Sequence, residues 1–413
     1  MKKNKIFRKI IIGLSAIGPG LFLIGYNIGT GSVITMAKTG AEHGMSLFWA
    51  LLLSCIFTYI LMVAYGKVTL VTGNTALFNF KKEFKWGAAL SIYIIITLII
   101  GELLALMGVM GIVADLVQEG IRLGFNDLII ETGWIILFFS IILYMLILFG
   151  RYSLFEKVLT ALVVTMAVSF LVVFIMVKPS LSSLIAGIVP RIPDTPGAFG
   201  LVAAISGTTC SAAVFVIRST VLAEKGWTVH DLRKEKKDSF VSASMMLFLS
   251  GIIMAVAAGT LHLSGVKLEN TIEIIYLFEP IGGKLAAFIL IIGIAGAGLS
   301  TIFPIVLIAP WLIADYRGTT RDIRTPQSRI LILLALLFAF GTIFMEQRPP
   351  VLMIFSQAFQ ACILPAVAIP VFLLINKKDL MHGHVAGMNQ NLAIVAVILF
   401  SFITTWLAII EFL

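Results

Sequence analysis

The chain contains few charged residues, which make up 12% of its 413 residues. A soluble domain carries about 25% charged and roughly 45–50% apolar residues. Here 60% of the residues are hydrophobic and the mean hydropathy is +1.06. Because a water-facing globule has no means of burying that excess, we expect lipid to surround most of the chain. The composition excludes a soluble enzyme, a nucleic-acid-binding module and a disordered scaffold.

Cysteine and histidine are also scarce, with three and five copies. The three cysteines lie far apart and form no C-x-x-C pair, so we expect neither a disulfide framework nor a cysteine metal site. The sequence has no G-x-x-x-x-G-K-[ST] phosphate loop, which argues against ATP as the energy source. It also lacks clustered catalytic groups at one membrane depth. We therefore expect no enzyme activity and no cofactor.

Eleven apolar runs are long enough to cross a bilayer, which takes about 20 helical residues. They are continuously apolar and lack the alternation of barrel strands, so they predict an all-α integral membrane protein. The runs cover residues 11–37, 46–71, 87–118, 128–149, 154–177, 197–222, 238–263, 282–315, 328–345, 350–375 and 392–411.

Lysine and arginine collect in alternate connections between these runs. With the N-terminus inside, 23 of the 30 basic residues fall on the inner side and 7 on the outer side. This asymmetry predicts a cytoplasmic N-terminus and an extracytoplasmic C-terminus, in what we expect to be a bacterial inner membrane. The net charge of +9 thus reflects the topology rather than binding to nucleic acid. The partners that we expect are the bilayer and a small solute or ion. The sequence does not indicate an oligomeric state.

Two runs contain residues that do not suit a continuous helix. The first is interrupted at Tyr26–Ser32, and the sixth at Ser206–Ser211. The breaks lie five spans apart, which predicts two inverted five-helix repeats, at 1–177 and 178–375, followed by a loop and an eleventh helix at 376–413. Matched breaks indicate the substrate site of a secondary transporter that works by alternating access. The alternative is that these small residues only let helices pack closely.

Several motifs resemble those of the Nramp metal-ion transporter family. They lie along nearly the whole chain: Gly18-Pro19-Gly20, Leu70–Gly73, Gly150-Arg151 with Glu156, Gly298–Thr301, and Leu352–Gln357 followed by Leu364-Pro365, Pro370 and Leu380-Met381. The resemblance implies the LeuT-type fold, with helices 1 and 6 broken at the midplane, and a divalent metal cation such as Mg²⁺ or Mn²⁺ carried together with protons.

The residues that bind metal in this family are changed here. Its Asp-Pro-Gly-Asn motif falls on Gly29-Thr30-Gly31-Ser32, and its Met-Pro-His-Asn motif falls on Ser211–Val214. Thr208 would supply the carbonyl donor, and Gln357 is retained. A later family histidine falls on Arg218, and Glu102 stands where the third span usually carries an acid.

No side chain at the two breaks carries a charge, so a divalent ion would be dehydrated without an anionic ligand. A small carboxylate would instead find free N–H groups where a half-helix starts. We therefore expect a small organic or amino-acid-like solute, with the divalent cation as the alternative and a non-transporting membrane sensor as the alternative of another class. The predicted substrate-binding residues are Asn27, Gly29, Thr30, Gly31, Ser32, Thr208, Thr209, Ser211 and Gln357.

Two further residues are candidates outside the breaks. Glu102 is an acid deep in an apolar run, which favours a role in proton or ion coupling over a simple pairing with a polar neighbour. Arg218 lies about two turns beyond the second break. It is a candidate for guarding the inner vestibule, or else an arginine that reaches out to the membrane interface.

Overall fold

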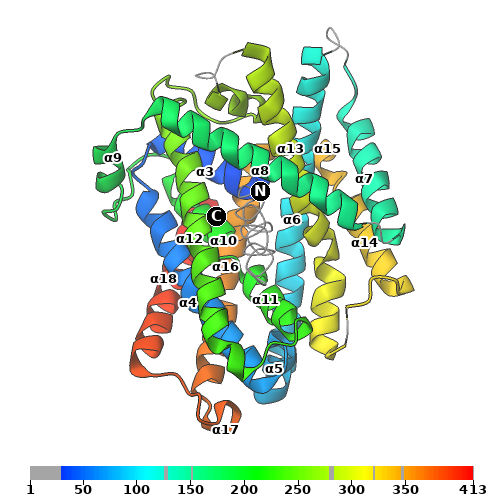
Figure 1. Ribbon diagram of the computed structural model, residues 1–413, viewed down its shortest axis with the longest axis vertical. Coiled ribbons are helices and arrows are strands. Elements are labelled where there is room, and N and C mark those ends of the chain that lie inside the picture. The colour runs from blue at the N-terminus through cyan, green and yellow to red at the C-terminus, as the bar shows by residue number, and fades with distance from the viewer. Residues whose placement is uncertain are drawn as a thin grey trace, which may run out of the picture.

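The computed structural model describes residues 29–124, 129–149, 152–278, 283–319, 321–345 and 348–412. All regular elements in these ranges are helical (Figure 1). They are α3 (Thr30–His43), α4 (Phe48–Thr72), α5 (Ala76–Glu83), α6 (Gly87–Gly124), α7 (Thr132–Phe149), α8 (Tyr152–Val177), α9 (Leu181–Ala186), α10 (Ala198–Thr209), α11 (Ala212–Glu224), η1 (Val229–Asp231), α12 (Leu232–Gly259), η2 (Thr271–Phe278), α13 (Gly283–Arg317), α14 (Pro326–Phe338), α15 (Gly341–Phe344), α16 (Pro349–Asn376), α17 (Lys378–Met381) and α18 (Met388–Phe412).

The described helices agree with the apolar runs of the sequence. Eight stretches are long and apolar enough to cross a membrane, and two shorter apolar helices cover 132–148 and 163–177. These ten correspond to the second to eleventh runs. Most of the first run lies outside the described residues, which include only its end as α3. The all-α membrane architecture is confirmed, while the count of eleven spans and the orientation of the termini stay predictions.

Helices suit these sequences because lipid offers no hydrogen bonds, so each backbone group must find a partner within its own segment. Prolines also occur inside the long helices. The long helices α13 and α16 each contain two internal prolines and still run as single helices, the first with Pro304 and Pro310 and the second with Pro365 and Pro370. Packing against neighbouring helices compensates for the backbone bonds that proline removes.

The packing places α3 and α10, which lie beside the two predicted breaks, in contact with the central helices of the bundle. Helix α6 packs along α13 and α16, α10 packs along α16, and α12 packs along α3 and α4. Helices five spans apart also touch, as in the pairs α3–α10, α4–α12, α6–α13 and α7–α14. This is the pattern expected of interlocked repeats, although the repeat boundaries stay predictions. Helix α14 lies at the edge of the molecule (Figure 1), with only 28% of its most apolar window buried.

Candidate substrate site

The second predicted break is present. Helix α10 ends at Thr209 and α11 begins at Ala212, with Cys210 and Ser211 between them in non-helical geometry. The hydroxyl of Thr58 in α4 donates to the Thr209 carbonyl over 2.9 Å, which satisfies one backbone group freed by the break. The interruption is therefore shorter than the Ser206–Ser211 segment in which the sequence placed it.

The first predicted break falls partly outside the described residues. Gly29 is the extended N-cap of α3, and Thr30 is the first residue of the helix. No side chain caps this end. Tyr26 and Asn27 lie outside the described residues.

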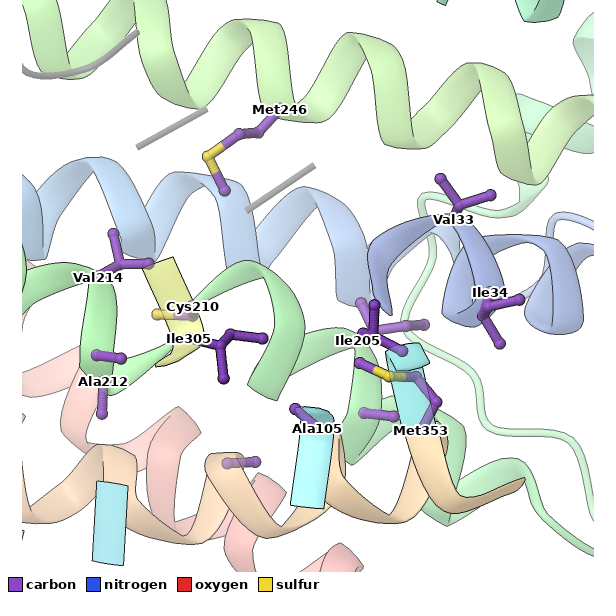
Figure 2. Close-up of a cluster of buried hydrophobic side chains, with 14 of the residues drawn as sticks. Val33, Ile34, Ala105, Ile205, Cys210, Ala212, Val214, Met246, Ile305 and Met353 are labelled. Carbon is purple, nitrogen blue, oxygen red and sulfur yellow. The ribbon is translucent and has the colours of Figure 1, made fainter. Parts of the chain in front are cut away.

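A cavity lies where α3, α6, α10, α13 and α16 meet, and it leaves room of about 30 Å³ for water-sized molecules. Figure 2 shows apolar side chains of these helices and their neighbours in the same region, among them Ala105, Ile305 and Met353, which line the cavity. The complete lining is Gly29, Gly31, Ser32, Glu102, Ala105, Thr208, Ser211, Thr301, Ile305, Met353, Gln357 and Gln360.

Most of the residues singled out from the sequence meet in this cavity. The ones that line it are Gly29, Gly31, Ser32, Glu102, Thr208, Ser211 and Gln357. Thr30 and Thr209 do not belong to the lining. The Thr30 hydroxyl donates to the carbonyl of Ile294 over 3.4 Å, and Thr209 offers its carbonyl to α4.

Hydrogen bonds hold the polar side chains of the cavity in place. The hydroxyls of Ser32 and Thr208 lie 3.0 Å apart and link α3 to α10. Ser211 donates to Oε1 of Gln360 over 2.8 Å, linking the break to α16. The hydroxyl of Thr301 donates to the Ala297 carbonyl over 2.9 Å, so its oxygen keeps acceptor capacity. The result is a set of oxygen atoms fixed by several different helices.

Two glycines allow the backbones to approach each other at the site. A Cβ on Gly31 would lie 2.5 Å from Cε of Met353 and 2.6 Å from Nε2 of Gln357. A Cβ on Gly207 would lie 1.7 Å from the backbone oxygen of Gln357. The absence of a side chain at Gly207 thus lets α10 touch α16, and its absence at Gly31 keeps the cavity open.

Two lining residues correct the expectation that a divalent cation would find no anionic ligand at the site. Glu102 of α6 is 2% exposed and brings a carboxyl group to the cavity. Met353 of α16 brings a thioether side chain, whose Cε lies beside Gly31 and whose Sδ lies beside Gly108 of α6. The sequence argument against a divalent ion counted only residues at the two breaks, so it named Glu102 for coupling without counting its carboxyl group as a ligand, and it did not consider Met353.

Arg218 does not reach out to the membrane interface, which corrects one of the two interpretations offered by the sequence, while its role at the inner vestibule stays a prediction. It does not line the cavity, and its side chain is fully buried rather than reaching the membrane interface. Its Nη2 donates to Glu235 over 2.8 Å, to Asp238 over 3.0 Å and to Ser239 over 2.9 Å. The arginine thus ties α11 to α12, because a buried charge requires a charged or polar partner.

Sequence reasoning missed Met353, Gln360 and Thr301 as lining residues, although one signal was available. Met353, Gln357 and Gln360 follow an i, i+4, i+7 spacing, which places them on one face of a helix. Thr301 and Ile305 follow the same i, i+4 rule on α13. Once Gln357 is a candidate, its helical neighbours become candidates as well.

The donors in the cavity are mixed rather than of one kind. In the described part of the chain, no group of three or more histidine, cysteine, aspartate or glutamate side chains lies close enough to hold a metal ion. The cavity instead offers hydroxyl and amide oxygens, one carboxyl group and one thioether.

Comparisons with known proteins place the chain in a family. Residues 20–411 match the family model described as natural resistance-associated macrophage protein-like (Nramp). A divalent metal cation transporter, MntH, of Pectobacterium carotovorum subsp. carotovorum is 26% identical over 300 residues, covering 70% of this chain and 69% of the relative. MntH of Yersinia enterocolitica is 24% identical over 299 residues, with 70% of each chain covered.

Solved structures share the fold. A manganese transporter of Eremococcus coleocola superposes with a TM-score of 0.71 at 16% identity, covering 96% of this chain and 86% of that one. Mhp1, a nucleobase-cation-symport-1 family transporter, superposes with a TM-score of 0.62 at 14% identity over 96% and 93% of the two chains. The all-α fold is of the LeuT type, and the chain belongs to the Nramp family of membrane transporters.

Proposed function

We propose that this protein carries a divalent metal cation across the membrane by alternating access, and that the cation passes through the cavity lined by Glu102, Met353 and Gln357. The observation that carries this proposal is the lining itself, which combines a buried carboxyl group with oxygen donors and a sulfur.

The size of the cavity favours an ion. One water molecule needs roughly 10–15 Å³ of such space, and the cavity offers about 30 Å³. That is enough for a cation with one or two retained waters. Pockets for organic ligands of drug size are usually about ten times larger or more. The expectation of an organic or amino-acid-like solute is therefore not supported.

The charge of the lining favours a cation. Glu102 provides the anionic group whose absence argued against a divalent ion at the level of sequence. Hydroxyl and amide oxygens, such as those of Ser32 and Gln357, are hard ligands that suit Mg²⁺, Ca²⁺ and Mn²⁺. The thioether of Met353 adds a soft ligand, which favours a transition metal over Mg²⁺ and Ca²⁺. Mn²⁺ suits the carboxylate and the amide oxygens, which are the ligands it prefers.

The names of the relatives also support a divalent metal cation as the substrate. The names of the two MntH proteins describe divalent metal cation transport, and the Eremococcus coleocola protein is described as a manganese transporter. Among the chain's own residues, Glu102 is the candidate for coupling to protons, because a carboxyl group in a cation site binds either the metal or a proton.

The experiment is Mn²⁺ influx into liposomes that contain the purified protein and a metal-sensitive dye. The wild type should transport Mn²⁺ in a saturable manner. Glu102→Gln keeps the size of the side chain but removes its charge, and should lower influx at least about tenfold, as loss of a charged hydrogen-bonding partner does.

Glu119→Gln is the matched control, because Glu119 lies on the same helix, is also buried and does not line the cavity. It should transport like the wild type. A wild type that carries no Mn²⁺, Mg²⁺ or other divalent cation but accumulates an amino acid would overturn the proposal.

A further inference from the structure

A second cavity lies at the turn between α13 and α14, toward the C-terminal end of the helix that also lines the central cavity. It has a volume of about 130 Å³ and is lined by the last turns of α13, by the first turns of α14 and by the connecting residues Thr319, Arg321, Asp322, Ile323 and Thr325. We call it the α13–α14 cavity. Its lining includes the side chains of Arg317 and Arg321. It shares no residue with the proposed cation site.

Arg321 is the central group of this cavity. Its side chain is only 10% exposed, and its Nε and Nη2 both donate to the carboxylate of Glu224, at the end of α11. Its guanidinium carbon lies 4.5 Å from the centre of the Trp311 ring. Nη1, by contrast, is buried and has no hydrogen-bond partner. A buried donor on a charged group without a partner is costly and indicates a missing acceptor.

The surroundings of Arg321 suit an acceptor with negative charge. Residues 315–329 contain four arginines and two aspartates, a net charge of +2. Including Glu224 still leaves +1. Asp322 also lines the cavity, and its Oδ1 accepts the backbone N–H of Arg324 over 2.9 Å. The cavity is also at the N-terminus of α14, whose N-cap is Thr325. The positive end of that helix adds to the attraction for an anion.

The position of the cavity identifies the source of the anion as lipid. Helix α14 exposes a row of apolar side chains that starts beside the cavity: Ile330, Leu333, Leu334 and Leu337. Trp311 and the arginines are the residue types that gather at the boundary between the hydrocarbon and the headgroups. A molecule that places its charge on Arg321 and its chains along α14 is an anionic phospholipid.

We propose that the α13–α14 cavity binds the phosphate headgroup of an anionic phospholipid, with Nη1 of Arg321 donating to a phosphate oxygen and Arg317 adding a second charge. The volume of about 130 Å³ accommodates a phosphate group and excludes the bulk of the lipid, whose chains lie outside on α14. Basic pockets between membrane helices bind anionic headgroups by this chemistry.

The test measures lipid binding to the delipidated full-length protein by native mass spectrometry. Phosphatidylglycerol and phosphatidylcholine with identical acyl chains are titrated separately, and inorganic phosphate is added as a soluble competitor. Phosphatidylglycerol should bind more tightly than phosphatidylcholine, and millimolar inorganic phosphate should not replace it. Arg321→Gln should weaken phosphatidylglycerol binding at least about tenfold, and Arg317→Gln less strongly.

Two control variants separate lipid binding from structural roles. Arg324→Gln removes the same charge from the same loop at a residue that does not line the cavity, and it should bind lipid like the wild type. Glu224→Gln weakens the same ion pair as Arg321→Gln but keeps the guanidinium, and it should retain or strengthen lipid binding. Equal losses in Arg321→Gln and Glu224→Gln would show that the ion pair is only structural and would overturn the proposal. Equal affinity for the two lipids, or displacement by inorganic phosphate, would overturn it as well.

Discussion

Glu102 is the only ionisable side chain among the twelve described residues that line the central cavity. In the proposed function its carboxylate is therefore the group that compensates for the cost of dehydrating a divalent cation. The other donors are neutral, and they set geometry and preference rather than charge. Affinity and selectivity should thus depend on different residues.

Met353→Leu tests how much the side chain of Met353 contributes to ion selectivity. The substitution nearly conserves volume, so the fold should tolerate it, while the sulfur is lost. We expect binding of Cd²⁺, a soft ion, to weaken about tenfold and binding of Ca²⁺, a hard ion, to change little. Calorimetric titration of the purified protein with both ions measures the difference. Parallel losses for Cd²⁺ and Ca²⁺ would indicate that Met353 only packs the cavity.

Gly31→Ala tests whether the start of α3 belongs to the site. The added Cβ would meet the flexible ends of Met353 and Gln357, which would have to move out of position. We expect Mn²⁺ binding to be lost or strongly weakened, with a small decrease in Tm, because side-chain ends adjust more easily than backbone. Gly383→Ala is the control, since nothing lies within 4 Å of its added carbon. Unchanged Mn²⁺ affinity in Gly31→Ala would remove α3 from the site.

The contact between α11 and α12 depends on a buried ion cluster. Arg218 is fully buried and bonds to both Glu235 and Asp238. Arg218→Met would leave two buried carboxyl groups without their cation, which costs about 3–5 kcal/mol. We expect a clearly lower Tm in detergent, measured by scanning fluorimetry.

The triple variant Arg218→Met, Glu235→Gln, Asp238→Asn tests the electrostatic origin of that loss. Because it removes the unpaired charges together with the arginine, it should recover part of the stability. A triple variant that is less stable than the single one would show that packing, rather than charge, holds α11 against α12.

The sequence predicts the helices, and its error at the second break is confined to a few residues. The apolar runs predict the helices of the described part of the chain because helices are the way for a single continuous apolar segment to satisfy its backbone in lipid. The second break was predicted at Ser206–Ser211 and is found at Cys210 and Ser211. Small and hydroxyl residues favour an interruption, but packing against α16 keeps the segment up to Thr209 helical.

The orientation of the whole molecule stays a prediction that cells can test. The distribution of basic residues places Ser264 outside and Lys378 inside, and both are exposed. Single cysteines introduced as Ser264→Cys and Lys378→Cys should therefore react differently with a membrane-impermeant maleimide added to intact cells. Ser264→Cys should be labelled, and Lys378→Cys should react only after the membrane is opened. The reverse pattern would show that the orientation is wrong.

The membrane class, the helices and the position of the second break follow from the sequence, because they depend on interactions within one segment or between a segment and lipid. The family could also be inferred, from motifs spread along nearly the whole chain. The sequence also named Glu102, Gln357 and five other lining residues, but it did not show that they share one cavity with Met353. Glu102 and Met353 are about 250 residues apart in the chain, and only the packing of α6 and α16 against the start of α3 brings the carboxyl group and the sulfur to one cavity. The same holds for Arg218, whose burial and partners are set by α12. A charge that seems absent from a short motif can come from a distant helix, so the tertiary structure decided the proposed substrate.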